Sequence, residues 1–166
     1  KVMEKLLFSG ASGFLGHNVM PILSKLYDIT TIGITEHDNI KANIAMEVPS
    51  LPKKYDVILH AAGKAHIYPK NQEEIQSFYD VNYEGTVNLC KALEKVGLPK
   101  SFIFISTLDV YGLAVGEDID ETYPKNPTTH YAISKLKAEE FLVDWAEEKG
   151  IILGILRPPL MTGPNP

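Results

Sequence analysis

Residues 5–16 read KLLFSGASGFLG, and this stretch decides the fold. The apolar run at 5–9 is typical of a short buried strand, and glycines follow it at positions 10, 13 and 16. Such glycines allow a tight turn, close backbone approach to a pyrophosphate, and close packing of the next helix on the strand. The amides and partial positive charge of a helix N-terminus favour phosphate there. The stretch predicts a dinucleotide-binding loop, with a purely structural strand–helix turn as the alternative.

Outward from this loop, apolar runs alternate with helical stretches. Further strands are expected at 29–34, 40–44, 57–61, 102–106 and 151–156. Helices are expected from the loop to about residue 26, over 73–96 as one or two helices, and over 131–149. Strands that are apolar on every residue and separated by helices indicate a parallel sheet covered on both faces. Right-handed crossovers then give an α/β fold, a doubly wound, Rossmann-like sheet with strand order 3-2-1-4-5-6.

Pro21 breaks the pattern of the first expected helix. Proline removes an amide donor and crowds the carbonyl four residues back. A kink or an early helix end is therefore expected near this residue.

Composition limits the classes of function. With 166 residues, 45% of them hydrophobic, the chain can bury one core and is too short for two ordinary domains. The net charge of −5, without a Lys/Arg cluster, excludes the basic face of a duplex binder. No apolar run reaches the roughly 18–20 residues of a membrane helix. The lone Cys90 excludes an internal disulfide. We expect a cytoplasmic domain without a signal peptide, a metal site, or a nucleic-acid or membrane partner.

Residues 131–135 read YAISK and place a phenol and an ammonium four residues apart. Residues i and i+4 share a helix face, so the lysine lies beside the phenol and favours its ionised form. An exposed helix face gives the same spacing, so the pair alone is weak evidence. However, the helix follows the strand at 102–106, which ends in Ser106 and Thr107. Because open α/β sheets bind ligands at the carboxyl ends of their strands, these groups form a candidate site for proton and hydride transfer.

Seven segments occur in an order and spacing that resemble the extended short-chain dehydrogenase/reductase family, the NAD-dependent epimerases and dehydratases of nucleotide sugars. They are GASGFLG at 10–16, HAAG at 60–63, VNYEGT at 81–86, STLDVYG at 106–112, IDET at 119–122, YAISK at 131–135 and LRP at 156–158. Any one of them is ambiguous, but the seven together are distributed along nearly the whole chain, from residue 10 to residue 158.

The resemblance implies roles for single residues. Tyr131 would be the acid/base on a sugar hydroxyl, Lys135 would lower its pKa and hold the nicotinamide ribose, and Thr107 would hydrogen-bond the reacting oxygen. Besides Tyr131 and Lys135, the residues implied at the cofactor are Gly10, Ser12, Gly13, Phe14, Leu15, Gly16, Asn43, Ile44, Ala61, Ala62, Gly63, Asn82 and Ser106.

For several residues a second interpretation stays open. Asn82 supports the site from behind or caps a helix beginning at Tyr83. Ser106 contacts the cofactor or only satisfies backbone groups, and His60 is expected to be a packed strand residue. Arg157, before two prolines, is a candidate for contact with substrate or an opposing domain.

The expected cofactor is NAD, with NADP not excluded. Relatives that prefer NAD carry Asp where this chain has Gly33, and Asn43 stands where relatives place an Asp against the adenine. Glu36 either replaces the missing acid or lies in a solvated loop, which is the preferred interpretation. No arginine stands nearby to bind a 2′-phosphate.

The favoured function is epimerisation of a nucleotide sugar through a transient keto intermediate and hydride return. A one-way reductase or dehydrogenase would use the same three catalytic residues, whereas a non-catalytic cofactor sensor would not need them. A 4,6-dehydratase is disfavoured, because relatives with that activity carry Asp-Glu where this chain has Leu108 and Asp109, and Asp109 is expected only to cap a turn. Family members continue past the sixth strand. Residues 1–166 are therefore expected to be the NAD(P)-binding domain of a longer, homodimeric protein, without its substrate-binding domain.

Overall fold

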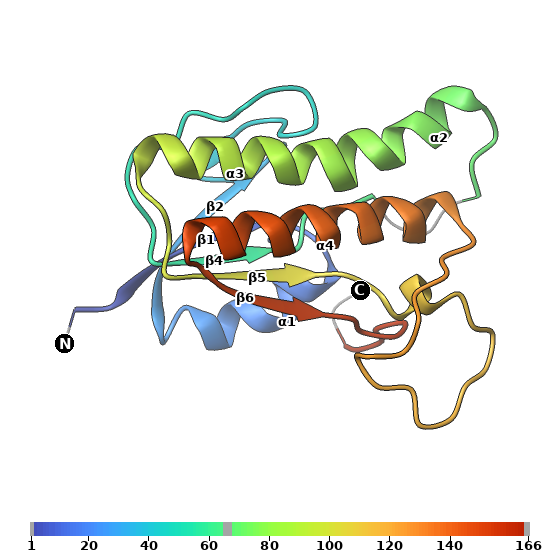
Figure 1. The fold of residues 1–166 in the computed structure, drawn as a ribbon. Helices are drawn as coiled ribbons and strands as arrows, with labels where there is room; N and C mark the ends of the chain where they lie inside the picture. Colours follow the sequence, from blue (N-terminus) through green and yellow to red (C-terminus); the bar gives the residue numbers. More distant parts are fainter. Residues whose placement is uncertain (1, 65–67, 165–166) are drawn as a thin grey trace.

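The computed structural model describes residues 2–64 and 68–164. Six strands within these residues form one parallel sheet in the order β3-β2-β1-β4-β5-β6, which confirms the predicted topology (Figure 1). They are β1 (Glu4–Ser9), β2 (Tyr27–Gly33), β3 (Ile40–Lys41), β4 (Val57–His60), β5 (Ser101–Ile105) and β6 (Ile152–Leu156). Every strand points the same way, so their carboxyl ends meet at one edge of the sheet.

Helices cover both faces of the sheet (Figure 1). One face carries α1 (Phe14–Leu23), and the other carries α2 (Gln72–Tyr79), the π-helical turn η1 (Asp80–Glu84), α3 (Gly85–Val96) and α4 (His130–Lys149). Alternate strand residues enter two separate clusters, since side chains of a strand point to opposite faces. Leu7 and Ile58 pack with α3 and α4, whereas Leu6 and Phe8 pack with α1.

The main differences from the expected elements lie at their ends. Helix α1 stops at Leu23, and Pro21 lies in its last turn, where the Ser24 amide still bonds the Met20 carbonyl at 2.9 Å. The early end predicted from Pro21 is thus confirmed. Strand β3 has only two residues, so the expected strand at 40–44 is too long.

The expected helical run at 73–96 is interrupted by η1. Because Asn82 lies inside this π-helical turn, the interpretation of Asn82 as a helix cap is wrong. The turn matters for the site, since it directs the Asn82 side chain into the protein interior, where it is 1% exposed.

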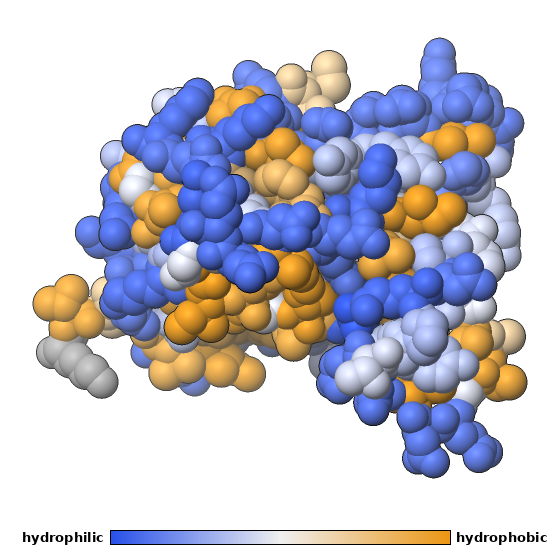
Figure 2. All heavy atoms as spheres, in the orientation of Figure 1, coloured by the Kyte–Doolittle hydropathy of each residue, from blue (hydrophilic) through white to orange (hydrophobic). Residues whose placement is uncertain are grey.

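The outer surface is uneven in polarity. Figure 2 shows polar side chains over much of the face formed by the α2–α4 layer and hydrophobic ones gathered over β6 and α1. Ile22 of α1 is more than half exposed, as are Ile152 and Leu156 of the edge strand β6. Among the described residues, no helix is both long and apolar enough to cross a membrane.

Candidate active site

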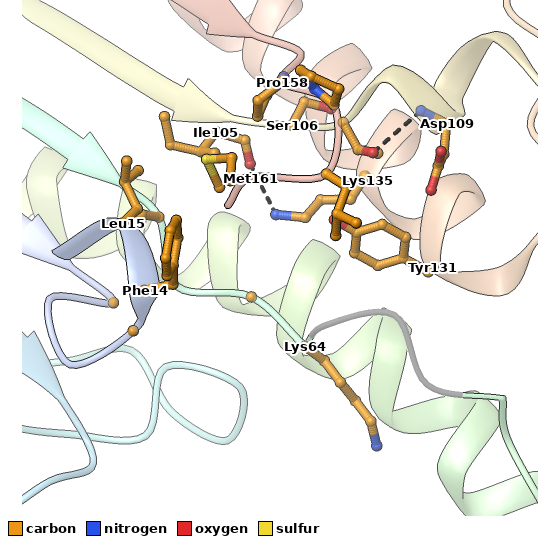
Figure 3. A pocket seen from close by; sticks show the side chains of 17 residues that line it. Phe14, Leu15, Lys64, Ile105, Ser106, Asp109, Tyr131, Lys135, Pro158 and Met161 are labelled. Carbon is orange, nitrogen blue, oxygen red and sulfur yellow. Dashed lines mark hydrogen bonds between the residues drawn. The ribbon is translucent and has the colours of Figure 1, made fainter. Parts of the chain in front are cut away.

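A cavity of about 650 Å³ opens at the carboxyl ends of β1, β4 and β5 (Figure 3). It brings the glycine loop and the three predicted catalytic residues to one place. Its lining consists of Gly10, Gly13, Phe14, Leu15, Ala61, Gly63, Lys64, Ile105, Ser106, Thr107, Asp109, Tyr131, Lys135, Pro158, Pro159, Leu160 and Met161. The sequence motifs did not predict Lys64 or residues 158–161 as site residues. The only signal for them in the sequence was their position at or next to the HAAG and LRP segments.

The three glycines of the loop are not equivalent. Gly10 has a φ of +79°, and a Cβ on it would lie 2.5 Å from the Ala62 nitrogen. A Cβ on Gly16 would lie 2.0 Å from the Ala11 carbonyl oxygen, so helix α1 can pack on the loop only with glycine here. Gly13, the N-cap of α1, has a φ of −84°, and a Cβ there would meet only the Gly10 oxygen, at 3.4 Å. Two glycines therefore shape the loop, and the third leaves space at the helix N-terminus.

This N-terminus fits an anionic ligand. Gly13 is the N-cap residue of α1, and among the described residues no side chain forms a capping hydrogen bond there. The first amides of α1 therefore face the cavity without a capping group. A helix N-terminus carries partial positive charge, which favours phosphate. The open space at Gly13 is the cradle that a pyrophosphate needs.

Lys135 is buried on the opposite wall. Its Nζ donates a 2.9 Å hydrogen bond to the Ile105 carbonyl (Figure 3). The same Nζ lies 4.9 Å from the centre of the Phe104 ring. A Cβ on Gly63 would lie 2.9 Å from this Nζ, so the Gly63 backbone passes directly over the ammonium. Burial lowers the pKa of Lys135 to about 8, against a smaller opposing effect of Glu139.

Tyr131 lies one helical turn before Lys135 and faces the cavity. Burial raises the pKa of its phenol; a hydrogen bond with Thr107 lowers it, and the Asp109 charge raises it. The expected lowering of this pKa by Lys135 is therefore wrong for this structure: burial raises the pKa of Tyr131, and Lys135 is not among the groups that shift it. In this state Tyr131 is a proton donor.

Thr107 and Asp109 differ from their expected arrangement. The Thr107 hydroxyl, not Asp109, caps the short 3-10 helix η2 (Leu108–Tyr111), because it accepts the Asp109 amide at 3.2 Å. The expectation that Asp109 is only a turn cap is wrong, since its side chain lines the cavity and its charge acts on Tyr131.

Ser106 places a buried hydroxyl without a hydrogen-bond partner in this wall. Its side chain is 3% exposed, and its Oγ has no hydrogen-bond partner among the described residues. The interpretation that Ser106 only satisfies backbone groups is therefore wrong. Buried hydroxyls are normally paired, so a cavity-lining Oγ without a partner fits a site whose polar ligand completes it.

A buried polar chain connects the loop with η1. The Ala62 amide donates to Ser9 Oγ at 3.2 Å, and Ser9 Oγ lies 2.5 Å from His60 Nδ1. His60 Nε2 lies 2.9 Å from Thr86 Oγ1, which donates to the Asn82 carbonyl at 2.8 Å. One proton direction satisfies every member: Ser9 donates to Nδ1, and Nε2–H donates to Thr86. Burial, with the nearby Lys135 charge, lowers the pKa of His60 to about 3, so His60 is a neutral, packed strand residue as predicted.

The Asn82 side chain lies behind the cavity. Its Oδ1 accepts the Lys64 amide at 2.8 Å, and its Nδ2 donates to Ser134 Oγ at 3.0 Å. Ser134 in turn donates to the Tyr131 carbonyl at 2.7 Å. Asn82 thus links the loop after β4 to the first turn of α4, and its predicted role as a support of the site stays a prediction.

Several residues predicted at the cofactor do not line this cavity. They are Ser12, Gly16, Asn43, Ile44, Ala62 and Asn82. Asn43 is exposed and its side chain accepts the Ala45 amide at 3.1 Å, whereas Ile44 is buried in the core beneath α3. Gly16 and Ala62 act through the loop backbone described above.

Arg157 has a structural partner. Its guanidinium forms a bidentate pair with Glu139 of α4, at 3.1 and 2.7 Å, and donates to the Tyr111 hydroxyl at 2.7 Å. Both charged side chains are largely buried. Arg157 thus joins the end of β6 to α4 and η2, and its predicted contact with substrate or an opposing domain stays a prediction.

Known proteins share this sequence and arrangement. The sequence model of the NAD dependent epimerase/dehydratase family matches residues 6–166. UDP-glucose 4-epimerase of Vibrio cholerae is 31% identical over 99% of this chain and 54% of its own length. GDP-6-deoxy-D-mannose reductase of Pseudomonas aeruginosa is 29% identical over 98% of the chain and 54% of its own length.

Solved structures of other proteins have the same fold. The structure of RMD from Pseudomonas aeruginosa complexed with NADPH superposes with a TM-score of 0.81 at 27% identity, over 98% of this chain and 55% of that one. UDP-glucuronic acid 4-epimerase of Bacillus cereus in complex with NAD, at 22% identity and a TM-score of 0.78, has the same fold over 98% of this chain and 58% of that one. The chain spans about half the length of the relatives it matches. With the fold, the glycine loop and the Thr107–Tyr131–Lys135 wall in place, the chain belongs to the NAD-dependent epimerase/dehydratase family.

Proposed function

We propose that residues 1–166 are the cofactor-binding domain of a longer enzyme that binds NAD or NADP and epimerises a nucleotide sugar. One observation carries this proposal: the cavity that contains the open helix N-terminus at Gly13 also contains Thr107, Tyr131 and Lys135. A phosphate cradle and an acid/base group in one cavity are what dinucleotide-dependent carbonyl chemistry requires.

The proposed roles follow from the contacts. The first turn of α1 and the open space at Gly13 bind the pyrophosphate, and Lys135 and the Ser106 hydroxyl bind the ribose and nicotinamide side of the cofactor. The bound nicotinamide supplies a hydride acceptor and donor. Thr107 orients the substrate oxygen, and the Tyr131 phenol exchanges a proton with it.

Reduction without return of the hydride is the second candidate. A reductase of Pseudomonas aeruginosa covers as much of this chain as the epimerase of Vibrio cholerae does, at nearly the same identity. The raised pKa of Tyr131 also favours it, because a protonated phenol protonates the alkoxide formed from a carbonyl. Net consumption of cofactor separates the two functions.

Dehydration is not proposed, although mouse dTDP-D-glucose 4,6-dehydratase is 35% identical over 68% of the chain. Elimination of water needs an acid and a base beyond the tyrosine. Asp109 lines the cavity and can accept a proton, but Leu108 next to it has no proton to donate. Nucleotide sugars are the proposed substrates, and we further propose a homodimer located in the cytoplasm.

The test is a screen of the full-length protein against UDP-, GDP- and dTDP-hexoses that follows both cofactor absorbance and sugar products. Epimerisation predicts a product of unchanged mass without net cofactor turnover. Turnover of one cofactor per product would instead establish the reductase, and a product lighter by one water would contradict our interpretation of Leu108.

In the same assay Tyr131→Phe should reduce turnover by roughly 10²–10⁴-fold, which is the usual contribution of general acid–base catalysis, and leave cofactor affinity unchanged. Tyr79→Phe is the matched control, because its hydroxyl bonds His130 on the outer surface, outside the cavity. A Tyr131→Phe enzyme as active as this control would refute the role of the phenol.

A further inference from the structure

His60, the last residue of β4, is a fully buried polar side chain that the roles proposed above do not use. It shares a strand face with Ile58 of the core cluster beneath α3, and its ring contacts the rings of Phe102 and Phe104. It does not line the cavity. An apolar side chain would fill this position without the desolvation of a polar ring. The hydrogen bonds of His60 therefore indicate what the imidazole does there.

The hydrogen-bond network assigns the proton to one nitrogen of this ring. A carbonyl can only accept, so the 2.8 Å contact between the Thr86 hydroxyl and the Asn82 carbonyl requires the hydroxyl hydrogen. Toward His60 the same hydroxyl can then only accept, so Nε2 bears the hydrogen. A neutral imidazole has one N–H, which leaves Nδ1 as the acceptor for the Ser9 hydroxyl. The chain from Ser9 to Asn82 thus has a single direction of donation.

This chain holds the backbone on both sides of Gly63. Ser9 Oγ accepts the amide of the residue before Gly63, and Asn82 Oδ1 accepts the amide of the residue after it. Between these two supports, the backbone that leads into Lys64 passes beside the Lys135 ammonium (Figure 3). The rest of the chain spans the interior between the two acceptors, and its length sets their separation.

The same chain reaches two further parts of the active-site wall. Ser9 directly precedes Gly10, where the glycine loop begins. At the other end, Asn82 donates to Ser134 in the first turn of α4. The glycine loop, the backbone over Lys135 and the helix of the catalytic tyrosine are therefore connected through one buried imidazole.

We propose that His60 is a positioning residue of the cofactor site. Its Nε2–H tautomer keeps Ser9 and Asn82 at a fixed separation, and so holds the glycine loop and the backbone over Lys135 in the geometry that the dinucleotide binds. A cofactor that meets a preset site does not have to order it on binding, which raises affinity. The inference rests on the proposed function, since it presupposes that this cavity binds a dinucleotide.

The first test locates the proton by nitrogen NMR of the full-length protein that carries isotope-labelled histidine, with the His60 signals assigned by their loss in His60→Gln. The proposed tautomer predicts a protonated Nε2 and an unprotonated Nδ1 near neutral pH. A proton on Nδ1, or on both nitrogens, would overturn the inference without the need for any further variant.

Calorimetric titration of the full-length protein with NAD then compares Thr86→Val with Thr86→Ser. Valine has the shape of threonine without its hydroxyl, so Nε2–H loses its acceptor. NAD affinity should fall about tenfold, because cofactor binding must then restore the order that the chain provided, at a cost the size of one unpaired buried donor. Serine keeps the hydroxyl, so the affinity of Thr86→Ser should lie within about twofold of the parent's.

Leu89→Val is the control for a general loss of stability. Leu89 is fully buried on the same helix, α3, and its side chain has no polar atom. The change should lower the melting temperature but leave NAD affinity within about twofold of the parent's. An equal loss of affinity in Leu89→Val and Thr86→Val would overturn the inference, because the effect would then be one of stability.

Ser9→Ala tests whether the two ends of the chain act through the ring. Ser9 and Thr86 bond opposite nitrogens of His60. If one chain carries the effect, breaking it twice costs no more than breaking it once, so the double variant should bind NAD about as weakly as either single variant. Losses that add in free energy would show two separate effects and overturn the role of His60.

The outcomes distinguish the inference from the proposed function. An NAD affinity unchanged in Thr86→Val would overturn the role of His60 while the proposed function stands. Failure of the parent to bind NAD or NADP would instead refute the proposed function. If Thr86→Val does not fold, Ser9→Ala and the nitrogen NMR of the parent decide, because an affinity of Ser9→Ala within about twofold of the parent's overturns the inference.

Discussion

At the first turn of α1 the cavity is lined by glycine backbone and the Phe14 and Leu15 side chains, whereas at the ends of β4 and β5 polar side chains are buried in or behind its wall. On the first side, Gly10 and Gly16 allow contacts that any Cβ would prevent, and charge enters only through the helix N-terminus. On the second side, His60 and Lys135 are buried, with pKa values lowered to about 3 and about 8. On the first side, steric fit therefore limits which residues the fold accepts. On the second side, the removal of ionisable groups from water lowers the stability of the fold.

The difference predicts opposite responses to mutation. Adding a side chain at Gly10 or Gly16 should destabilise the fold, because the backbone atoms that a Cβ would meet there cannot move aside. Replacing a buried charge in the other wall by an apolar group of similar size should stabilise the fold, because burial of that charge is unfavourable. Sites that keep such a charge do so for function at the expense of stability.

The largest effect is expected for Gly16→Val. Its Cβ would be placed 2.0 Å from the Ala11 carbonyl oxygen, so α1 must separate from the loop. We expect a loss of about 3 kcal/mol or more in the free energy of unfolding, measured by urea denaturation. Gly154→Ala is the control, since a Cβ there meets only Ile103 Cγ1, at an ordinary 3.7 Å. Equal stability of the two variants would show that the loop does not need glycine at position 16.

Lys135→Met is expected to have a smaller effect of opposite sign. Lowering the lysine pKa from 10.5 to about 8 corresponds to about 3 kcal/mol, of which lost contacts offset a part, so the variant should be about 1–3 kcal/mol more stable at pH 7. The free-energy cost of burying the charged Lys135 ammonium is present in full below pH 8. It is relieved between about pH 8 and 10.5, where Lys135 holds its proton only in the unfolded chain. Parent stability should rise over this range relative to that of Lys135→Met.

The control for that comparison is Lys137→Met, which removes an exposed ammonium from the same helix. It should change stability by less than about 0.5 kcal/mol at either pH. A Lys135→Met protein less stable than the parent at pH 7 would mean that the hydrogen bond to Ile105 and the contact with Phe104 outweigh the desolvation of the ammonium.

The same contrast explains what the sequence could predict. The glycine loop and the Tyr131–Lys135 spacing are local patterns, so their positions along the chain determine their geometry, and the strand order followed from apolar runs between helices. The link from Ser9 through His60 to Thr86 joins residues far apart in sequence, and no local pattern reveals it.

Misplaced residues have the same cause. Arg157 was a candidate for contact with substrate or an opposing domain, and the sequence did not reveal its pairing with Glu139, 18 residues away on the neighbouring helix. Gly33 suggested a missing acid, whereas the fold returns Asp38 to the same space from the following turn. In both cases the tertiary partner, and not the residue's own neighbours in sequence, decides the environment.

The central claim is that the open space at Gly13 is where a dinucleotide phosphate binds, and the affinity of Gly13→Val for NAD tests it most directly. We expect the fold to tolerate this change, because φ at Gly13 is −84° and a Cβ there meets only the Gly10 oxygen, at 3.4 Å. Calorimetry on the full-length protein should show affinity reduced about 100-fold or more, with a melting temperature within a few degrees of the parent's. A folded Gly13→Val protein that binds NAD as tightly as the parent would contradict the claim.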